Sequence, residues 1–185
     1  MKKKKWIWLL FIDTETTGLS YSDQIIQFAA IYGIFDGKNF NEETRINQYI
    51  NITKEINPFA QRVHKISKSM VEKYDYIDWY IDTFMEYVEK SDCVIWHNIS
   101  FDIRMLRQDC ERIWRTHNLE SVRTFCTMKD TYACESLNCK KRPKLRILYN
   151  ELFGKNFENA HDAMADIEAT KDCFLELINR GEICL

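Results

Sequence analysis

A run of consecutive apolar residues near the N-terminus, Trp6–Ile12, most constrains the fold of this chain. Its length and aromatic content are typical of a central β-strand that is covered on both faces. The preceding lysines, Lys2–Lys5, make the region resemble a signal peptide. The run ends directly in Asp13, however, offers no small-residue cleavage site and is far too short to span a bilayer. We therefore expect a buried strand and no membrane partner.

The order of the expected strands indicates the fold class. Ile25–Phe35 is a second β-prone run, and the Asp-Gly pair after it signals a hairpin into a third strand near Arg45–Ile50. Two short strands are expected at Cys93–Trp96 and Val122–Cys126. This order predicts an α/β fold with a mixed five-stranded sheet, its first three strands antiparallel, flanked by helices.

Helical signals fill the remaining segments. Asn57 before Pro58 is an N-cap followed by a first-turn proline, and Ser67 is suited to cap a second short helix. The longer helices are expected at Ile77–Val88, Ile103–Ile113, Met128–Leu137, Lys144–Phe153 and Asp162–Asn179.

Composition limits the organisation, the compartment and the partners. With 185 residues, two prolines and five glycines, we expect one domain over residues 1–185 and no linker. The net charge of −2 does not suit a protein that coats nucleic acid. Basic runs at Lys2–Lys5 and Lys140–Arg146 are most often solvated surface, although they would suffice to grip a strand end. Seven cysteines without a C-x-x-C pair favour a reducing cytoplasm over disulfides or a zinc site.

The first acidic pair follows the apolar run Trp6–Ile12. Because residues two apart on an extended strand face the same way, Asp13 and Glu15 project side by side at the end of a buried strand. Alone, such a pair more often marks a polar turn than a catalytic site.

A third acid, Asp102, follows the expected strand Cys93–Trp96 at the start of a helix. Its simplest explanation is a favourable interaction with the helix dipole. Asp102 also lies four residues before Leu106, on the apolar face of that helix, so we expect its carboxylate to point inward.

The last acid, Asp166, lies three residues after Ala163 and borders the apolar face of the final helix. His161 is five residues before Asp166 and cannot share a helix face with it. We expect His161 in the preceding loop, with Asp162 as a cap. A lone histidine at such a place is more often structural than catalytic.

Together these positions put four acids at strand ends or helix starts, each directed toward the core. If they converge, repulsion is severe, because two unit charges about 4 Å apart repel by ~4 kcal/mol at an effective dielectric of about 20. Such a cluster stays ionised only with bound cations, and an all-oxygen ligand set indicates Mg²⁺ or Mn²⁺. Two such ions suit in-line displacement at a phosphate.

Three ordered motifs resemble the DEDD exonucleases, in the variant with histidine in its last motif (DEDDh). The motifs are Asp13-x-Glu15 with Thr16-Thr17-Gly18, His97-Asn98-x-x-Phe101-Asp102 and His161-x-Ala163-x-x-Asp166. The likeness runs from about Trp6 to Leu177. The family includes RNase T, the three-prime repair exonucleases and the proofreading epsilon subunit of bacterial DNA polymerase III. The resemblance implies an RNase H-like fold.

The resemblance also implies the chemistry. Asp13, Glu15, Asp102 and Asp166 would bind two Mg²⁺ or Mn²⁺ ions. His161 would be the general base for a water that attacks the phosphodiester at a 3′ end and releases a nucleoside 5′-monophosphate. An imidazole, with an ordinary pKa of ~6.5, suits this role near neutrality.

Substrate contacts are implied in the same way. They would come from Thr16, Leu19, His64, Asn98 and Phe101. Leu19 would be an apolar wedge against the terminal base, although core packing explains Leu19 and Phe101 equally well. The family usually has glycine after the residue that matches His64, and here Lys65 stands there. Lys65 would either reach a phosphate or alter the loop.

The leading hypothesis is a 3′→5′ exonuclease for single-stranded DNA, or for DNA and RNA both, in proofreading or repair. One alternative is an RNA-directed 3′ exoribonuclease or oligoribonuclease. The other is a non-catalytic polymerase accessory module, which the intact catalytic positions disfavour. A homodimer stays open. The chain ends at Leu185, soon after the last helix, so we expect a free-standing enzyme rather than one tethered to a polymerase.

Overall fold

A computed structural model describes residues 6–129 and 142–185 of the chain. Its centre is a five-stranded sheet of order β3-β2-β1-β4-β5. The strands are β1 (Ile7–Thr16), β2 (Ile25–Phe35), β3 (Phe40–Tyr49), β4 (Cys93–Trp96) and β5 (Thr124–Cys126). β2 pairs antiparallel with β1 and β3, whereas β4 pairs parallel with β1 and β5. The predicted mixed sheet is confirmed.

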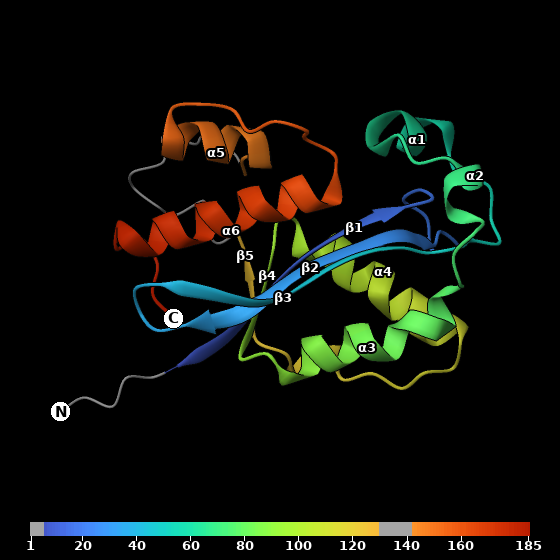
Figure 1. Ribbon diagram of the computed structural model, residues 1–185, viewed down its shortest axis with the longest axis horizontal. Helices are drawn as coiled ribbons and strands as arrows, with labels where there is room; N and C mark the ends of the chain where they lie inside the picture. The colour runs from blue at the N-terminus through green and yellow to red at the C-terminus, as the bar shows by residue number, and fades with distance from the viewer. Residues whose placement is uncertain (1–5, 130–141) are drawn as a thin grey trace.

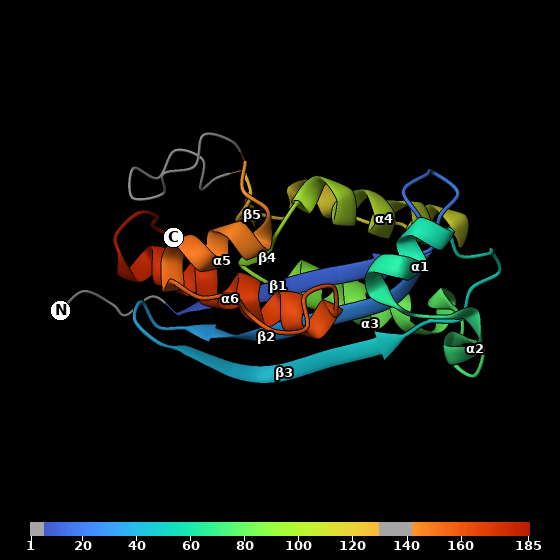
Figure 2. The same ribbon diagram turned by 90° about the horizontal axis from the view of Figure 1, so that it is seen from above.

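Helices cover both faces of the sheet. They are α1 (Pro58–His64), α2 (Lys68–Val71), α3 (Ile77–Lys90), α4 (Ile99–Arg112), the 3₁₀ turn η1 (Leu119–Ser121), α5 (Leu145–Phe153) and α6 (Ala163–Asn179). Figure 1 shows α5 and α6 above the sheet and α3 and α4 below it. In both views α1 lies at the end of the sheet toward which β1 points, next to the first turns of α6 (Figures 1 and 2). No helix in residues 6–129 or 142–185 is long and apolar enough to cross a membrane.

Side-chain alternation along β1 joins the two helical layers. Leu10 and Ile12 pack into the cluster formed with α3 and α4. Leu9 and Phe11 face the other way, into the cluster formed with α6, where the Phe11 and Phe174 rings meet edge to face at 5.6 Å. β1 is therefore buried on both faces, as its unbroken apolar sequence predicts.

Several element boundaries differ from the sequence prediction. β1 continues to Thr16 instead of stopping at Ile12, because β2 supplies partners along its whole length. β3 starts already at Phe40, directly after the hairpin, because its pairing with β2 begins there with Phe35. The strand expected at Val122–Cys126 is shorter, and the helix expected at Met128–Leu137 lies mostly outside the described residues.

Candidate active site

The end of β1 projects beyond one of its neighbours. Pairing with β4 ends at Phe11 and Ile95, whereas pairing with β2 continues to Thr16. By alternation, Asp13 and Glu15 lie on the α6 face of the sheet, and Thr14 lies on the α4 face. The last residues of β1 thus present polar side chains to both helical layers. On the β4 side, these residues have no neighbouring strand in the described part of the chain.

Asp102 reaches this edge from the first turn of α4. Asn98, between β4 and α4, has a φ of 76°, a left-handed conformation that asparagine tolerates, and the helix starts at the next residue. Asp102 is 3% exposed, and Thr14 Oγ1 donates a hydrogen bond to its Oδ1 at 2.7 Å. The inward orientation expected for Asp102 is confirmed.

Asp166 arrives from the first turn of α6. The Asp162 side chain caps this helix by accepting the Ala165 N–H at 3.1 Å. His161 lies in the loop before the cap with a φ of 74°, and its backbone N–H donates to both Asp166 carboxylate oxygens at 3.3 Å. The imidazole of His161 is exposed. The predicted loop position and cap are confirmed.

The pKa values show that the four acids lie within electrostatic reach of one another. Burial, and then the charges of Asp102, Glu15 and Asp166, raise the pKa of Asp13 well above its usual range. Burial and the charges of Asp166 and Asp102 raise the pKa of Glu15 to about 8. Burial raises the pKa of Asp102 to about 7 and that of Asp166 to about 6, against hydrogen bonds from Thr14 and His161. Burial therefore favours the neutral form of each of these acids, and a bound cation would favour the ionised form.

This donor set fits a hard divalent cation, which prefers carboxylate oxygens. The acids provide the type of ligand atom that such an ion prefers, but they are not arranged around a common point. Among residues 6–129 and 142–185, no three His, Cys, Asp or Glu side chains are grouped closely enough to form a ready-made metal site. A bound ion would therefore require the acids to lie closer together than they do in this structure.

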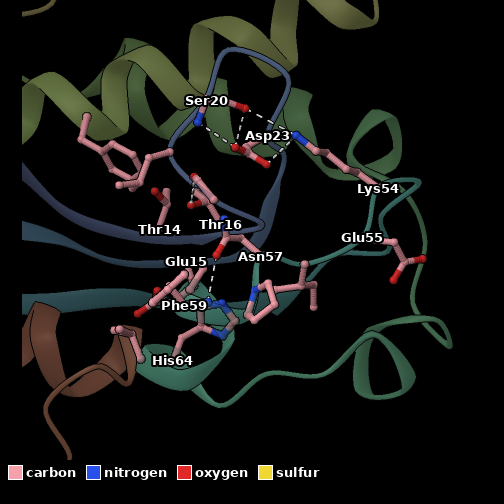
Figure 3. Close-up of a pocket in the computed structure, with 17 residues that line it drawn as sticks. Thr14, Glu15, Thr16, Ser20, Asp23, Lys54, Glu55, Asn57, Phe59 and His64 are labelled. Carbon is pink, nitrogen blue, oxygen red and sulfur yellow. Dashed lines mark hydrogen bonds and ion pairs between the residues drawn. The ribbon is translucent and has the colours of Figure 1, made fainter.

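A cleft of about 1020 Å³ opens beside Glu15, between the loop at residues 18–23 and α1 (Figure 3). Four of the five expected substrate contacts line it: Thr16, Leu19, His64 and Phe101. The fifth, Asn98, is exposed at the start of α4 and does not line the cleft. The structure therefore brings most of the expected contacts to one cavity next to the acids.

The individual side chains in the cleft differ in burial. Leu19 is 74% exposed, so core packing does not explain it. Phe101 is half-buried against the α3–α4 core. His64 is buried, its Nδ1 accepts the Ile66 N–H at 3.0 Å, and burial lowers its pKa. Lys65 has a φ of 62° at the end of α1, a conformation that favours glycine, and its side chain is exposed.

Asp23 holds the loop that carries Leu19. Its buried carboxylate accepts hydrogen bonds from Thr17 and Ser20 and pairs with Lys54 at 2.8 Å (Figure 3). Burial alone would raise the pKa of Asp23, but these hydrogen bonds outweigh it and hold the pKa well below its usual range. A Cβ on Gly18 would lie 2.7 Å from an Asp23 oxygen, so glycine is required for this close approach.

One face of α4 binds the same loop from the other side. Arg104 donates to the Leu19 carbonyl at 3.1 Å, Gln108 to the Tyr21 carbonyl at 2.5 Å and Arg112 to the Asp23 carbonyl at 2.9 Å. Sequence reasoning missed these three residues. Their spacing of four was the available signal, because it places long polar side chains on one helix face.

The sequence of this chain matches an exonuclease family. The family model RNase_T, described as exonuclease, matches residues 10–174. The chain therefore belongs to this DEDD-type exonuclease family and is a 3′→5′ exonuclease, a phosphodiester hydrolase. Among its relatives, DNA polymerase III subunit epsilon of Buchnera aphidicola is 30% identical over 178 residues, which cover 90% of this chain and 69% of that protein. The epsilon subunit of Pasteurella multocida is 25% identical over 91% of this chain and 67% of its own length.

Solved structures share the fold. Exonuclease X in complex with 5′ overhanging duplex DNA superposes with a TM-score of 0.71 at 22% identity, over 95% of this chain and 94% of that one. E. coli Exonuclease I with a dT13 oligonucleotide gives a TM-score of 0.80 at 21% identity, over 94% of this chain and 41% of that one. The RNase H-like architecture implied by the sequence motifs is thereby confirmed.

Proposed function

We propose that this exonuclease removes nucleotides from the 3′ ends of single-stranded DNA and releases nucleoside 5′-monophosphates. Four acids that approach one another at the end of β1, where the charges of the others raise the pKa of Asp13 and Glu15, carry the proposal. DNA is favoured as substrate because the relatives are subunits of DNA polymerase III and the similar structures hold DNA. Proofreading or repair is the corresponding role.

In the proposed mechanism, Asp13, Glu15, Asp102 and Asp166 would hold two Mg²⁺ or Mn²⁺ ions. Bound there, the ions would neutralise the carboxylates, polarise the scissile phosphate and make the attacking water more acidic. Thr14 fixes the orientation of the Asp102 carboxylate through its 2.7 Å hydrogen bond.

His161 acts as the general base in this mechanism. Its backbone N–H is bound to Asp166, which keeps the residue beside the acids, while its exposed imidazole is free to approach bound substrate. A ring nitrogen of His161 accepts the proton of the water as the water oxygen bonds to the terminal phosphorus. The P–O3′ bond breaks, and the shortened strand leaves with a 3′-hydroxyl after its oxygen takes up a proton from solvent.

The cleft holds the terminal nucleotide in this proposal. The exposed Leu19 and the half-buried Phe101 both line an apolar cavity large enough for a nucleotide, and both present apolar surface that a base can stack on. Thr16 and His64 lie deeper in the cavity, where both are buried. Asp23 and α4 keep the Leu19 loop in place before substrate arrives.

The test compares 5′-labelled single-stranded DNA, duplex DNA and RNA of one sequence. We expect single-stranded DNA to be shortened from its 3′ end with Mg²⁺ or Mn²⁺, and EDTA to stop the reaction. Asp13→Ala should abolish activity, and His161→Ala should lower kcat by roughly 10²–10⁴-fold. RNA shortened while DNA stays intact would replace DNA by RNA as the substrate, and full activity of either variant would refute the mechanism.

The cysteines fit a reducing cytoplasm as the place of action. Cys110 and Cys173 are buried free thiols, and Cys184 is an exposed one. Exposed thiols persist where the compartment is reducing. Whether the enzyme acts alone, as a homodimer or with a polymerase would follow from its mass in solution and in pull-down experiments.

A further inference from the structure

A second hollow, of about 650 Å³, adjoins the active-site cleft along α1. It is lined by Pro58, Phe59, Gln61, Arg62 and Lys65. Pro58 and Phe59 line the cleft as well, so the two cavities meet at the start of α1. Phe59 is among the residues that line the cleft together with Glu15 and His64 (Figure 3). A strand end seated in the cleft therefore has a continuous path along this helix.

Phe59 has the properties of a stacking platform. Its side chain is 72% exposed, although burial of a phenylalanine is strongly favourable. The guanidinium carbon of Arg62 lies 4.4 Å from the centre of its ring, so one face of the ring carries a cation and the rest faces solvent. Aromatic rings and guanidinium planes are the surfaces on which single-stranded bases stack.

The charge around α1 suits a phosphate backbone. Residues 54–73 contain five basic and two acidic residues, in a chain whose net charge is −2. Lys54 is paired with Asp23, and Lys68 with Glu55. In the described parts of the chain, Arg62 and Lys65 have no acidic partner. These two cations remain available to an anionic ligand.

We propose that α1 carries a second nucleotide subsite, in which Phe59 stacks on a base 5′ of the terminal nucleotide while Arg62 and Lys65 contact its phosphates. The inference rests on the proposed function, because it extends the path of the same substrate strand. Longer strands are then bound more tightly than the terminal nucleotide alone. This binding weakens with salt, because each phosphate contact on a single strand contributes a slope of roughly −0.7 in log K against log salt.

The experiment compares a substrate that reaches this subsite with one that does not. The first is a 12-nucleotide oligothymidine, and the second is the p-nitrophenyl ester of thymidine 5′-monophosphate, which fills only the terminal site. The quantity compared is kcat/KM for the oligothymidine divided by kcat/KM for the p-nitrophenyl ester. We expect Phe59→Ala and the double variant Arg62→Gln/Lys65→Gln each to lower this ratio by roughly 5- to 50-fold. The double variant should also reduce the salt slope by about 1.4.

Matched controls remove an aromatic ring or a cation elsewhere. Trp79 is 75% exposed on α3, across the sheet from α1, and Lys38 is exposed in the turn between β2 and β3. Trp79→Ala and Lys38→Gln should leave the ratio unchanged. Glutamine at position 65 is chosen over glycine because it removes the charge without freeing the backbone.

Binding of a labelled oligothymidine in EDTA gives a readout that does not depend on catalysis. The double variant should bind it roughly tenfold more weakly than wild type at low salt. Unchanged oligonucleotide binding and an unchanged ratio would overturn the subsite while leaving the exonuclease proposal intact. Wild type that binds the strand but cleaves neither substrate with Mg²⁺ or Mn²⁺ would overturn the proposed function instead.

Discussion

Thr14 Oγ1 donates a 2.7 Å hydrogen bond to Asp102 Oδ1, although the two residues are 88 positions apart in the sequence. The bond joins the end of β1 to the first turn of α4 across a buried space. Burial raises the pKa of Asp102 to about 7, and this hydrogen bond opposes the increase. Thr14 therefore favours the ionised, oriented form of a carboxylate that we propose as a metal ligand.

Thr14→Val tests this role, because valine keeps the shape and loses the donor. We expect the affinity for Mn²⁺ at pH 7 to fall by roughly 10- to 100-fold, as for other residues that orient metal ligands. The free energy of unfolding should fall by about 1–3 kcal/mol, because a buried acceptor loses its partner. Calorimetric titration with Mn²⁺ measures the affinity. Thr124→Val, at an exposed position of β5, is the control, and equal affinities in the two variants would count against the role.

The raised pKa of Glu15 predicts a pH dependence of stability in metal-free protein. The folded-state pKa is about 8, and the unfolded value is near ~4.3, so between these values the folded protein retains a proton that the unfolded chain has lost. The resulting stabilisation is complete below the unfolded pKa and is lost as pH rises through about 8. Wild-type Tm in EDTA should therefore fall more between pH 5.5 and 8.5 than the Tm of Glu15→Gln.

Divalent cations should reverse this loss. Because the ligands must be deprotonated, Mg²⁺ should raise the Tm of wild type more at pH 8.5 than at pH 5.5. Thermal unfolding monitored by circular dichroism, with and without Mg²⁺, measures both effects. Parallel Tm curves for wild type and Glu15→Gln in EDTA would show that Glu15 has an ordinary pKa.

Gly18→Ala should disturb the substrate loop without unfolding the protein. The added Cβ would lie 2.7 Å from the Asp23 carboxylate, which must shift and weaken its bonds to Thr17 and Ser20. We expect KM for single-stranded DNA to rise by roughly tenfold, because about 1.4 kcal/mol of binding is lost with a displaced loop. Steady-state kinetics measure KM, and circular dichroism checks the fold. An unchanged KM would mean that the Leu19 loop does not position substrate.

Lys65→Gly should stabilise the protein. Lys65 has a φ of 62°, and a left-handed residue other than glycine costs roughly 1–2 kcal/mol. Relief of about 1 kcal/mol should raise Tm by about 2–4 °C in a protein of this size. The same change at Lys68, at the start of α2, should lower Tm, because glycine disfavours the right-handed helix. A lower Tm for Lys65→Gly would mean that its side chain makes a stabilising contact.

The sequence predicted the elements that local patterns encode. An unbroken apolar run indicated a strand buried on both faces, and β1 is one. The Asn57–Pro58 pair indicated the start of α1, where the Asn57 side chain accepts the Phe59 N–H. The predicted ends of the strands were less accurate, because pairing with neighbouring strands decides where a strand ends. β1 extends through Asp13 and Glu15 because β2 provides partners there.

The sequence by itself determined the residue types of the site and their order, because alternation along a strand and periodicity along a helix are local properties. Such patterns placed Asp13, Glu15, Asp102 and Asp166 at strand ends and helix starts, and the resemblance to the DEDD exonucleases added the role expected of His161. Only the tertiary structure decided that the four acids share one region, that Thr14 supports Asp102, and that α4 and Asp23 hold the Leu19 loop. Those contacts join segments far apart in the chain, and they form because β1 carries one set of side chains to α6 and the alternate set to α4.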